Sequence, residues 1–420
     1  MPDPFAPDAC WDGDCFVARA FYFKNGEMTD LGSLAPGFSS DVSWLSPGGL
    51  ISGEAQTGLS DENGWTMHGV LWDRGKMIDL GTLDGGPVSL SSSVNDAGEV
   101  AGFSLNTIPD PFSFLGFFQT RAYRWKNGVM QDLGTLGGPD AMAVRINERG
   151  QIAGNSYIDF NPSDACRLAE GAFLWDEGKM SNLGGLGGTC TTVADMNNRG
   201  QIVGGSLLAG DKAQHAFLWQ RGTLSDLGTL GGNFAAAVAI NESGDVSGVQ
   251  SLAGNDALAH ATLWTGGQIL DLGALNPDGC SIATNSNSQQ QTVGVNSYDC
   301  DFDDDPSLRA ILSERGGPVV DLNTLIPPNS GVQLRNASII NERGEIVAAA
   351  YYADGNHGPV LLVPCDGDDC QNSGVPLLST ARTAQKAKTS TGVHRNLFNK
   401  GLGQLRAKQL FGPMGKLPRR

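Results

Sequence analysis

"HAFLWQRGTLSDLGTLGG", residues 215–232, is the stretch that decides the fold, because variants of it occur along most of the chain. Its first five residues return as "HGVLW" (68–72), "RAYRW" (121–125), "GAFLW" (171–175) and "HATLW" (260–264). Its tripeptide "DLG", with the variants "NLG" and "DLN", begins at seven positions: 30, 79, 132, 182, 226, 271 and 321. A period of 44 to 53 residues is typical of propeller blades and related arrays.

Each unit contains four short segments rich in β-branched and aromatic residues, as strands are. The first ends at an aromatic residue such as Trp219, and the second is the region around "DLGTL". The third ends in "IN", as at 240–241, and the fourth is "IAG", "IVG" or "VSG". Glycine in the turns between them accepts the positive φ that hairpins need.

The sequence therefore predicts an all-β fold, a seven-bladed β-propeller built from seven four-stranded repeats over residues 16–370. A ring of this kind leaves only short, protected strand edges. A further apolar stretch, "PVLLVP" at 359–364, follows the seventh unit. We expect it to pair near the N-terminus and help to close the ring.

The repeated side chains have structural and functional interpretations. Phe173, Leu174 and Trp175 and their counterparts are expected to pack one blade against the next, whereas an aromatic ligand platform would need exposed rings. The "DLG" aspartates could line an axial channel and collect cations. We favour hydrogen bonds to turn amides instead, because Asn182 occupies the same position and its amide can accept those bonds without a charge.

The pattern of "HAFLW", "DLGTLGG" and "IN..GQIVG" resembles the HAF-repeat family, predicted bacterial extracellular repeat proteins. The resemblance covers roughly residues 16–364 and is most specific at 132–138 and 226–232. It implies secretion and a propeller-like β architecture, and it carries no established activity. The chain departs from the family in its start, which lacks a signal-peptide pattern, and in its degenerate first, sixth and seventh units.

Charge is divided unevenly along the chain. Residues 371–420 hold ten Lys or Arg and no Asp or Glu, whereas residues 1–370 carry a net charge of −27. The acidic body argues against nucleic-acid binding, and we expect the basic tail to be disordered. No run of 18 apolar residues is present, so we expect no transmembrane segment.

The eight cysteines fall into four local pairs: Cys10 with Cys15, Cys166 with Cys190, Cys280 with Cys300, and Cys365 with Cys370. The first pair lies in the N-terminal segment 1–15 and the last in an Asp-rich stretch. An even count in local pairs favours disulfides and an oxidising compartment. Zinc is the weaker interpretation, because no pair has the two-residue spacing of zinc ligands.

Irregular loops are the places where a symmetric scaffold acquires function. Asp299, Asp301, Asp303 and Asp305 alternate in "DCDFDDD" and could supply oxygens to calcium, although the sequence lacks the glycine of a twelve-residue calcium loop. An insertion at 110–118 contains four phenylalanines: Phe112, Phe114, Phe117 and Phe118. Exposed, they would form a binding surface. Folded back, they would form a small satellite core.

We expect a secreted, monomeric, non-catalytic scaffold at the cell surface or outside the cell that binds an extracellular polymer or a protein partner. No catalytic residue or cofactor site stands out, and calcium is the one ion that the sequence suggests. Two alternatives stay open: a propeller enzyme, such as a glycan hydrolase or lyase with acids in the loops, and a structural component of the envelope.

Overall fold

The computed structural model describes residues 17–24, 26–61, 64–115, 118–163, 165–302 and 307–365. In these residues the chain is all-β, with strands and one short 3-10 turn, Leu322–Thr324 (η1). The N-terminal segment 1–15 and the tail 371–420 lie outside the described residues, so the expectations for them stay predictions.

The third and fourth strands of each unit form a hairpin. The third strands are β3 (Ser40–Leu45), β7 (Ser89–Val94), β11 (Ala141–Ile146), β15 (Gly187–Met196), β19 (Gly231–Ile240), β23 (Cys280–Ser286) and β27 (Val332–Ile340). The fourth strands are β4 (Ile51–Asp61), β8 (Val100–Pro109), β12 (Ile152–Ser163), β16 (Ile202–Leu208), β20 (Val246–Leu252), β24 (Gln291–Ser297) and β28 (Ile346–Tyr352).

The first and second strands form another hairpin. The first strands are β1 (Phe21–Lys24), β5 (Gly64–Asp73), β9 (Phe118–Lys126), β13 (Arg167–Asp176), β17 (Gln214–Gln220), β21 (Asn255–Thr265) and β25 (Arg309–Glu314). The second strands are β2 (Glu27–Asp30), β6 (Lys76–Asp79), β10 (Val129–Asp132), β14 (Lys179–Asn182), β18 (Thr223–Asp226), β22 (Gln268–Gly273) and β26 (Val320–Asp321). One more strand, β29 (His357–Leu362), follows β28.

Each four-stranded sheet combines the third and fourth strands of one unit with the first and second strands of the next. Thus β3, β4, β5 and β6 form one antiparallel sheet, and β7 to β10 form the next. The groups β11–β14, β15–β18 and β19–β22 are joined by single parallel residue pairs, Glu170 with Cys190 and Gln214 with Phe234. Every complete sheet therefore depends on two successive repeats, as in other repeat proteins.

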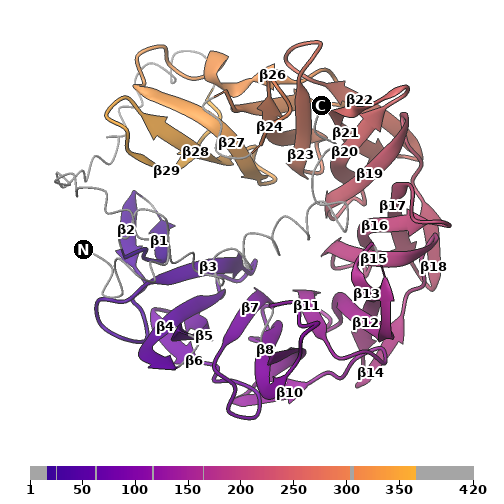
Figure 1. Cartoon of the computed structure of the whole chain (residues 1–420). Helices are drawn as coiled ribbons and strands as arrows, with labels where there is room; N and C mark the ends of the chain where they lie inside the picture. Colours follow the sequence, from indigo (N-terminus) through magenta and orange to yellow (C-terminus); the bar gives the residue numbers. More distant parts are fainter. Residues whose placement is uncertain are drawn as a thin grey trace, which may run out of the picture.

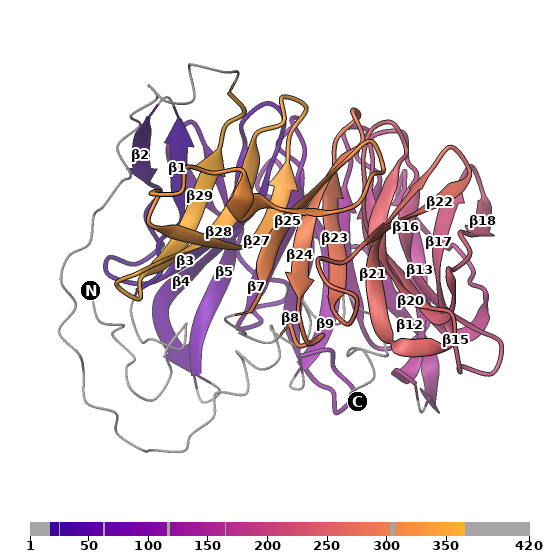
Figure 2. The same cartoon turned by 90° about the horizontal axis from the view of Figure 1, so that it is seen from above.

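The sheets follow one another around a common centre, with the third strands innermost and the second strands outermost (Figure 1). Viewed at right angles, the strands run between two ends of the molecule (Figure 2). We call the end with the hairpins between third and fourth strands the turn end. The opposite end, where the fourth strand of one unit connects to the first strand of the next, is the loop end.

The core lies between neighbouring sheets. Phe217 of β17 is fully buried against Ala153 and Ala172 of the preceding sheet, together with Val193 and Ile202 of its own sheet. A similar arrangement recurs at two other junctions, through Phe173 at the position equivalent to Phe217 and through Trp175 and Trp264 two residues later in the unit. Burying one such ring contributes about 1.5–3 kcal/mol. The predicted packing role of the aromatic residues is therefore confirmed at these junctions.

The glycine of the "IAG" and "IVG" strands makes room for these rings. A Cβ added at Gly154 would lie 2.1 Å from the Met142 carbonyl oxygen and 2.7 Å from the Phe173 ring. A Cβ added at Gly204 would lie 1.9 Å from the Thr192 carbonyl oxygen and 3.1 Å from the Phe217 ring. The fourth strand therefore needs a residue without a side chain opposite each aromatic residue.

A ladder of asparagines joins the sheets at the turn end. The Asn197 amide donates to the Asn241 carbonyl oxygen at 3.0 Å, and Asn241 donates in the same way to Asn287, and Asn287 to Asn341. Asn95 bonds the carbonyl of Asn147 at 3.1 Å. We call this series the turn ladder. Each rung links two sheets through a side chain that also shapes its own turn.

β29 differs from the expectation for "PVLLVP". It pairs with β28 and completes a three-stranded sheet with β27, and no pairing with β1 is present among the described residues. The hairpin β1–β2 forms a separate two-stranded sheet between β29 and β3 (Figure 1). β28 is closer in sequence, and its edge is available, so the local antiparallel pairing forms instead.

Replacing Asn197 by Ala removes the bond to Asn241 and two bonds that Asn197 Oδ1 accepts from the amides of Arg199 and Gln201. We expect the free energy of unfolding to fall by about 1–3 kcal/mol, because buried polar groups lose their partners. Urea unfolding measures the loss. Arg199→Ala, at an exposed position in the same turn, should change it by less than about 0.5 kcal/mol. An equal loss in both variants would contradict the ladder.

Candidate functional site

The repeated histidine and aspartate form one side-chain pair at the loop end. His215 Nδ1 lies 2.8 Å from Asp226 Oδ2, and Asp226 Oδ1 accepts a hydrogen bond from the Gly228 amide at 2.7 Å. The histidine that begins the pentapeptide therefore fixes the aspartate side chain of the next strand by a hydrogen bond. That aspartate in turn accepts a hydrogen bond from the turn that follows it. The recurrence of "HAFLW" with "DLG" has a direct structural cause.

Five units contain such a pair, with either His or Arg as the partner: Arg19–Asp30, His68–Asp79, Arg121–Asp132, His215–Asp226 and His260–Asp271. Burial raises the pKa of Asp271, but hydrogen bonds from His260 and the Gly273 amide outweigh burial, so the pKa lies below its ordinary value. The aspartates lie on the outermost strands and bond turn amides. They do not form an axial ring, and the structural interpretation holds.

The irregular feature of the loop end is a set of lengthened hairpins. β4–β5, β8–β9 and β12–β13 belong to three consecutive sheets and extend further than the hairpin β16–β17. Their outer parts expose Leu59 (68%), Ile108 (53%) and Phe160 (63%). The equivalent parts of β16–β17 end in a short turn at 209–213. One side of the loop end therefore presents apolar side chains that the repeat does not require.

The phenylalanine-rich insertion lies beside these hairpins. Phe114 and Phe118 are half-buried and pack against a cluster that contains Leu105 and Leu115, and Phe114 stacks on Tyr157 with ring centres 4.4 Å apart. Phe112 is also half-buried, and Phe117 lies outside the described residues. The insertion of one sheet therefore contacts the hairpin of the next. Partner binding through these rings stays a prediction.

Two buried carboxyl groups lie beneath the insertion. Asp140 is inaccessible to solvent and accepts hydrogen bonds from the amides of Phe114 (2.7 Å) and Thr120 (2.9 Å). Burial raises the pKa of Asp140 to about 7; the two amides lower it, and the neighbouring Asp110 carboxyl raises it further. Asp110 is also buried. Asp140 therefore holds its proton over much of the acidic range, and its two hydrogen bonds with backbone amides fasten the insertion to the next sheet.

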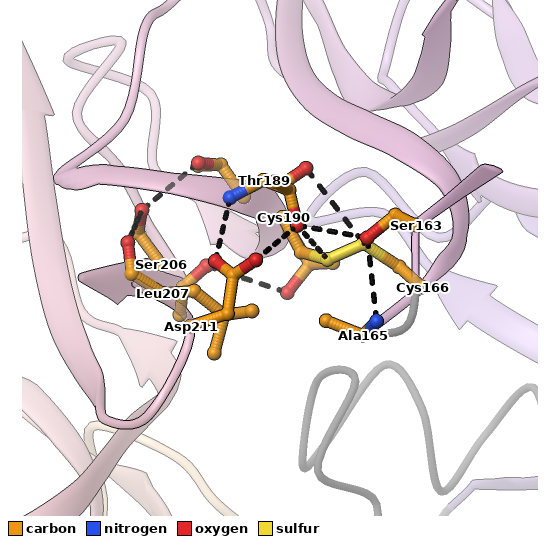
Figure 3. The surroundings of a disulfide bond; sticks show 11 residues. Ser163, Ala165, Cys166, Thr189, Cys190, Ser206, Leu207 and Asp211 are labelled. Atoms are coloured by element: carbon orange, nitrogen blue, oxygen red, sulfur yellow. Dashed lines mark hydrogen bonds between the residues drawn. A yellow bond between two sulfur atoms is a disulfide. The ribbon is translucent and has the colours of Figure 1, made fainter. Parts of the chain in front are cut away.

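A disulfide joins two of the sheets at the same end (Figure 3). Cys166, just before β13, is bonded to Cys190 of β15, and Ser163, Thr189 and Asp211 surround the bond. Cys280 is bonded to Cys300 within one sheet. Both predicted pairs are confirmed. Cys365 is also disulfide-bonded, and its partner lies outside the described residues, as do Cys10, Cys15 and Cys370.

The predicted calcium ligands lie after β24. Asp299 accepts hydrogen bonds from Ser297 Oγ and the Asp301 amide. Asp303 and Asp305 lie outside the described residues. In the described part of the chain no group of three Asp, Glu, His or Cys side chains is placed to hold a metal ion. A calcium site in this loop stays a prediction.

A cluster beside the centre was missed by sequence reasoning. The third strands share a register irregularity, and in one of them it precedes Asp195. Arg145 Nε lies 2.7 Å from Asp195 Oδ1, and the Arg145 guanidinium lies 3.8 Å above the Trp44 ring, which comes from two sheets away. We call Trp44, Arg145 and Asp195 the axial cluster. All three residues occupy the same position of the repeat, directly after the register irregularity of a third strand. The sequence signal is that this position holds a different residue type in every unit: Trp44, Ser93, Arg145, Asp195, Ala239, Asn285 and Ile339.

No family model matches the chain. No curated protein is significantly similar to it. Among solved structures, a TolB of Agrobacterium tumefaciens is 13% identical, with a TM-score of 0.36, and the alignment covers 69% of this chain and 95% of that one. Dipeptidyl peptidase 4 of Porphyromonas gingivalis is 8% identical, with a TM-score of 0.38, over 78% of this chain and 53% of that one. The described residues contain no helix long and apolar enough to cross a membrane.

Asp271→Asn keeps an oxygen that can accept the Gly273 amide, as the natural Asn182 accepts that of Gly184. We expect the free energy of unfolding to change by less than about 1 kcal/mol, whereas Asp271→Ala should lower it by about 1–2 kcal/mol. The ionic contribution is present above the ordinary carboxyl pKa and is lost as the pH falls through the lowered pKa of Asp271. Chemical unfolding at pH 7 and pH 3 measures both effects. Equal losses in the two variants at pH 7 would refute this role.

Asp110→Asn replaces a carboxyl group with an amide that can donate to Asp140. The raised pKa of Asp140 means that the folded state binds a proton that the unfolded state releases above about pH 4, so stability declines up to about pH 7. We expect this decline to become smaller and the variant to be more stable than the wild type at pH 8. Thermal unfolding from pH 4 to 8 tests it. Asp159→Asn, on the neighbouring hairpin, should leave the decline unchanged, and an unchanged decline in Asp110→Asn would contradict the buried pair.

Proposed function

We propose that the chain is a secreted, monomeric member of the HAF-repeat family whose seven units form a closed propeller. The offset of every complete sheet over two repeats supports this, because such an array gains most from joining its ends. The His–Asp and Arg–Asp pairs give the family's defining residues a structural role. The disulfides Cys166–Cys190 and Cys280–Cys300 fit an oxidising, extracellular or envelope location.

The proposed activity is binding of an extracellular polymer or protein through the loop end. The observation that carries it is the exposure of Leu59, Ile108 and Phe160 on three consecutive hairpins. The recurring aromatic residues that pack between the sheets are buried, so the exposed apolar side chains are not part of that packing. Apolar groups gathered on one exposed face are typical of interaction sites. We call them the hairpin face.

Binding is favoured over hydrolysis by the position of the paired carboxyl groups. A glycan hydrolase or lyase needs two carboxyl groups that a substrate can reach, about 5–10 Å apart. Asp110 and Asp140 are one pair that the described residues bring together at the loop end, and both are buried beneath the insertion that carries Phe114. Their geometry fastens a loop. A substrate cannot reach these two buried carboxyl groups.

The hairpin face is tested by binding to an array of glycans and surface polymers, with and without calcium. The triple variant Leu59→Ser, Ile108→Ser, Phe160→Ser should bind at least about tenfold more weakly than the wild type, which corresponds to about 1.4 kcal/mol. The matched control is Leu45→Ser with Val129→Ser, because both side chains are exposed and lie at the turn end. It should bind as the wild type does.

Equal binding by the triple variant and the wild type would reject the hairpin face. Turnover of a polysaccharide by the wild type would favour the enzyme alternative. No ligand on the array would favour a structural component of the envelope, and the binding proposal would fall.

A further inference from the structure

The hairpin β1–β2 is half of a sheet. Every other first strand of a unit pairs with a fourth strand on its inner side and with a second strand on its outer side. β1 pairs only with β2 among the described residues. The inner edge of β1 therefore has unpaired backbone groups in the place where two further strands would fit.

One side of the hairpin is already packed. Ala20 and Tyr22 contact Ile51 and Trp72 of the next sheet, and the Trp72 indole donates to the Leu31 carbonyl at 2.9 Å. This is the contact that a preceding sheet makes at the other junctions. The hairpin is therefore held in the position of the outer half of a complete sheet.

The other side of the hairpin is uncovered. Phe21 and Phe23 are 37% and 36% exposed, whereas Phe217, at the position equivalent to Phe21, is fully buried. Their natural cover is the preceding sheet, which here is β27–β29. That sheet also exposes an apolar row across its three strands, formed by Ile339, Val347 and Leu361, which are direct cross-strand partners.

Two of these exposed residues lie on inner strands. Ile339 is on β27 and Val347 is on β28, and the equivalents of Val347 in other sheets, such as Val203, are fully buried by the next sheet's inner strands. Within the described ranges, the sheet of β1 and β2 has no inner strands to cover them. The turn ladder stops at the same place in the described part of the chain: Asn341 donates to Glu345 of its own turn, as the other rungs do to theirs, but meets no further asparagine carbonyl there.

The sequence after residue 365 contains a matching pair of inner strands. Residues 399–407, "NKGLGQLRA", repeat the signature of "NERGQIAG" (147–154) and "NNRGQIVG" (197–204) with one residue inserted in the turn. Apolar residues precede it, as they precede "IN" in the other units. Aligned on Gln404, Leu405 corresponds to Ile202, and Ala407 falls on the position that Gly204 holds in β16 and Ala348 holds in β28.

We propose that residues 393–412 complete the β1–β2 sheet as its inner hairpin. Together with the six four-stranded groups and the β27–β29 sheet, this gives the ring eight blades, one more than the seven units predict. The fourth-strand part, beginning at Gln404, pairs with the inner edge of β1, so that Leu405 lies opposite Phe23 as Ile202 lies opposite Trp219. The preceding part covers Ile339 and Val347. Asn399 supplies the next carbonyl of the turn ladder after Asn341.

The chain is long enough to reach this place. Residues 366–392 connect β29 to the proposed hairpin, and when extended they span roughly 90 Å, which exceeds the path along one sheet and around its edge. The segment is also basic, so the acidic body of the chain attracts it electrostatically. The tail then has a defined role, which is to seal the junction between the first and last units.

Cysteine cross-linking in the full-length chain tests the register. In the variant Phe23→Cys with Leu405→Cys, mild oxidation should give an intramolecular disulfide, identified by peptide mapping without reduction, at least about tenfold more than in the control Phe23→Cys with Lys416→Cys. Equal or absent cross-linking in both variants would overturn the proposal. A disulfide-linked dimer would overturn it in favour of a second copy at this edge.

Hydrogen exchange tests the same pairing without new cysteines. Leu405→Asp should make the amides of β1 exchange at least about tenfold faster than in the wild type, and Leu417→Asp, outside the hairpin, should not. Unchanged exchange in Leu405→Asp would overturn the proposal. Both experiments are independent of any ligand of the hairpin face, so their failure and the failure of the proposed binding function are distinguishable.

Discussion

The structure depends on aromatic side chains of one sheet packing against small residues of the preceding sheet. A single four-stranded sheet of this size carries apolar side chains on both faces and cannot bury them by itself. Phe217 gains its burial from Ala153 and Ala172, which belong to another sheet, and Gly204 leaves the space that the ring requires. Each repeat is therefore stable only in the presence of its neighbours, which is the property that makes the array cooperative.

Polar contacts set the order and the spacing of the sheets. At the turn end the asparagine ladder joins successive sheets through their side chains, and at the loop end His–Asp and Arg–Asp pairs hold together the first and second strands of five units. The apolar contacts supply most of the stability, because they bury the larger area. The hydrogen bonds contribute specificity, because a displaced sheet would leave buried donors and acceptors without partners.

The irregular parts of the chain interrupt this regular frame at one side. Four irregular features lie on or between neighbouring sheets near the loop end. They are the lengthened hairpins, the phenylalanine-rich insertion, the buried Asp110–Asp140 pair and the Cys166–Cys190 disulfide. Two of these features, the carboxyl pair and the disulfide, hold loops in place. The exposed side chains of the hairpin face are consequently carried on a rigid support, which lowers the entropy lost when a partner binds.

Periodicity in the sequence determined the strand order, the turns, the packing role of the aromatic residues and two disulfides, because each of these depends on spacing within one repeat or between adjacent repeats. The sequence could not place β29, whose pairing depends on which sheet edge lies within reach. It also could not reveal the axial cluster or the raised pKa of the Asp140 carboxyl group. Those properties arise where side chains from different units meet, and there burial and distance, which only the tertiary structure sets, decide the chemistry.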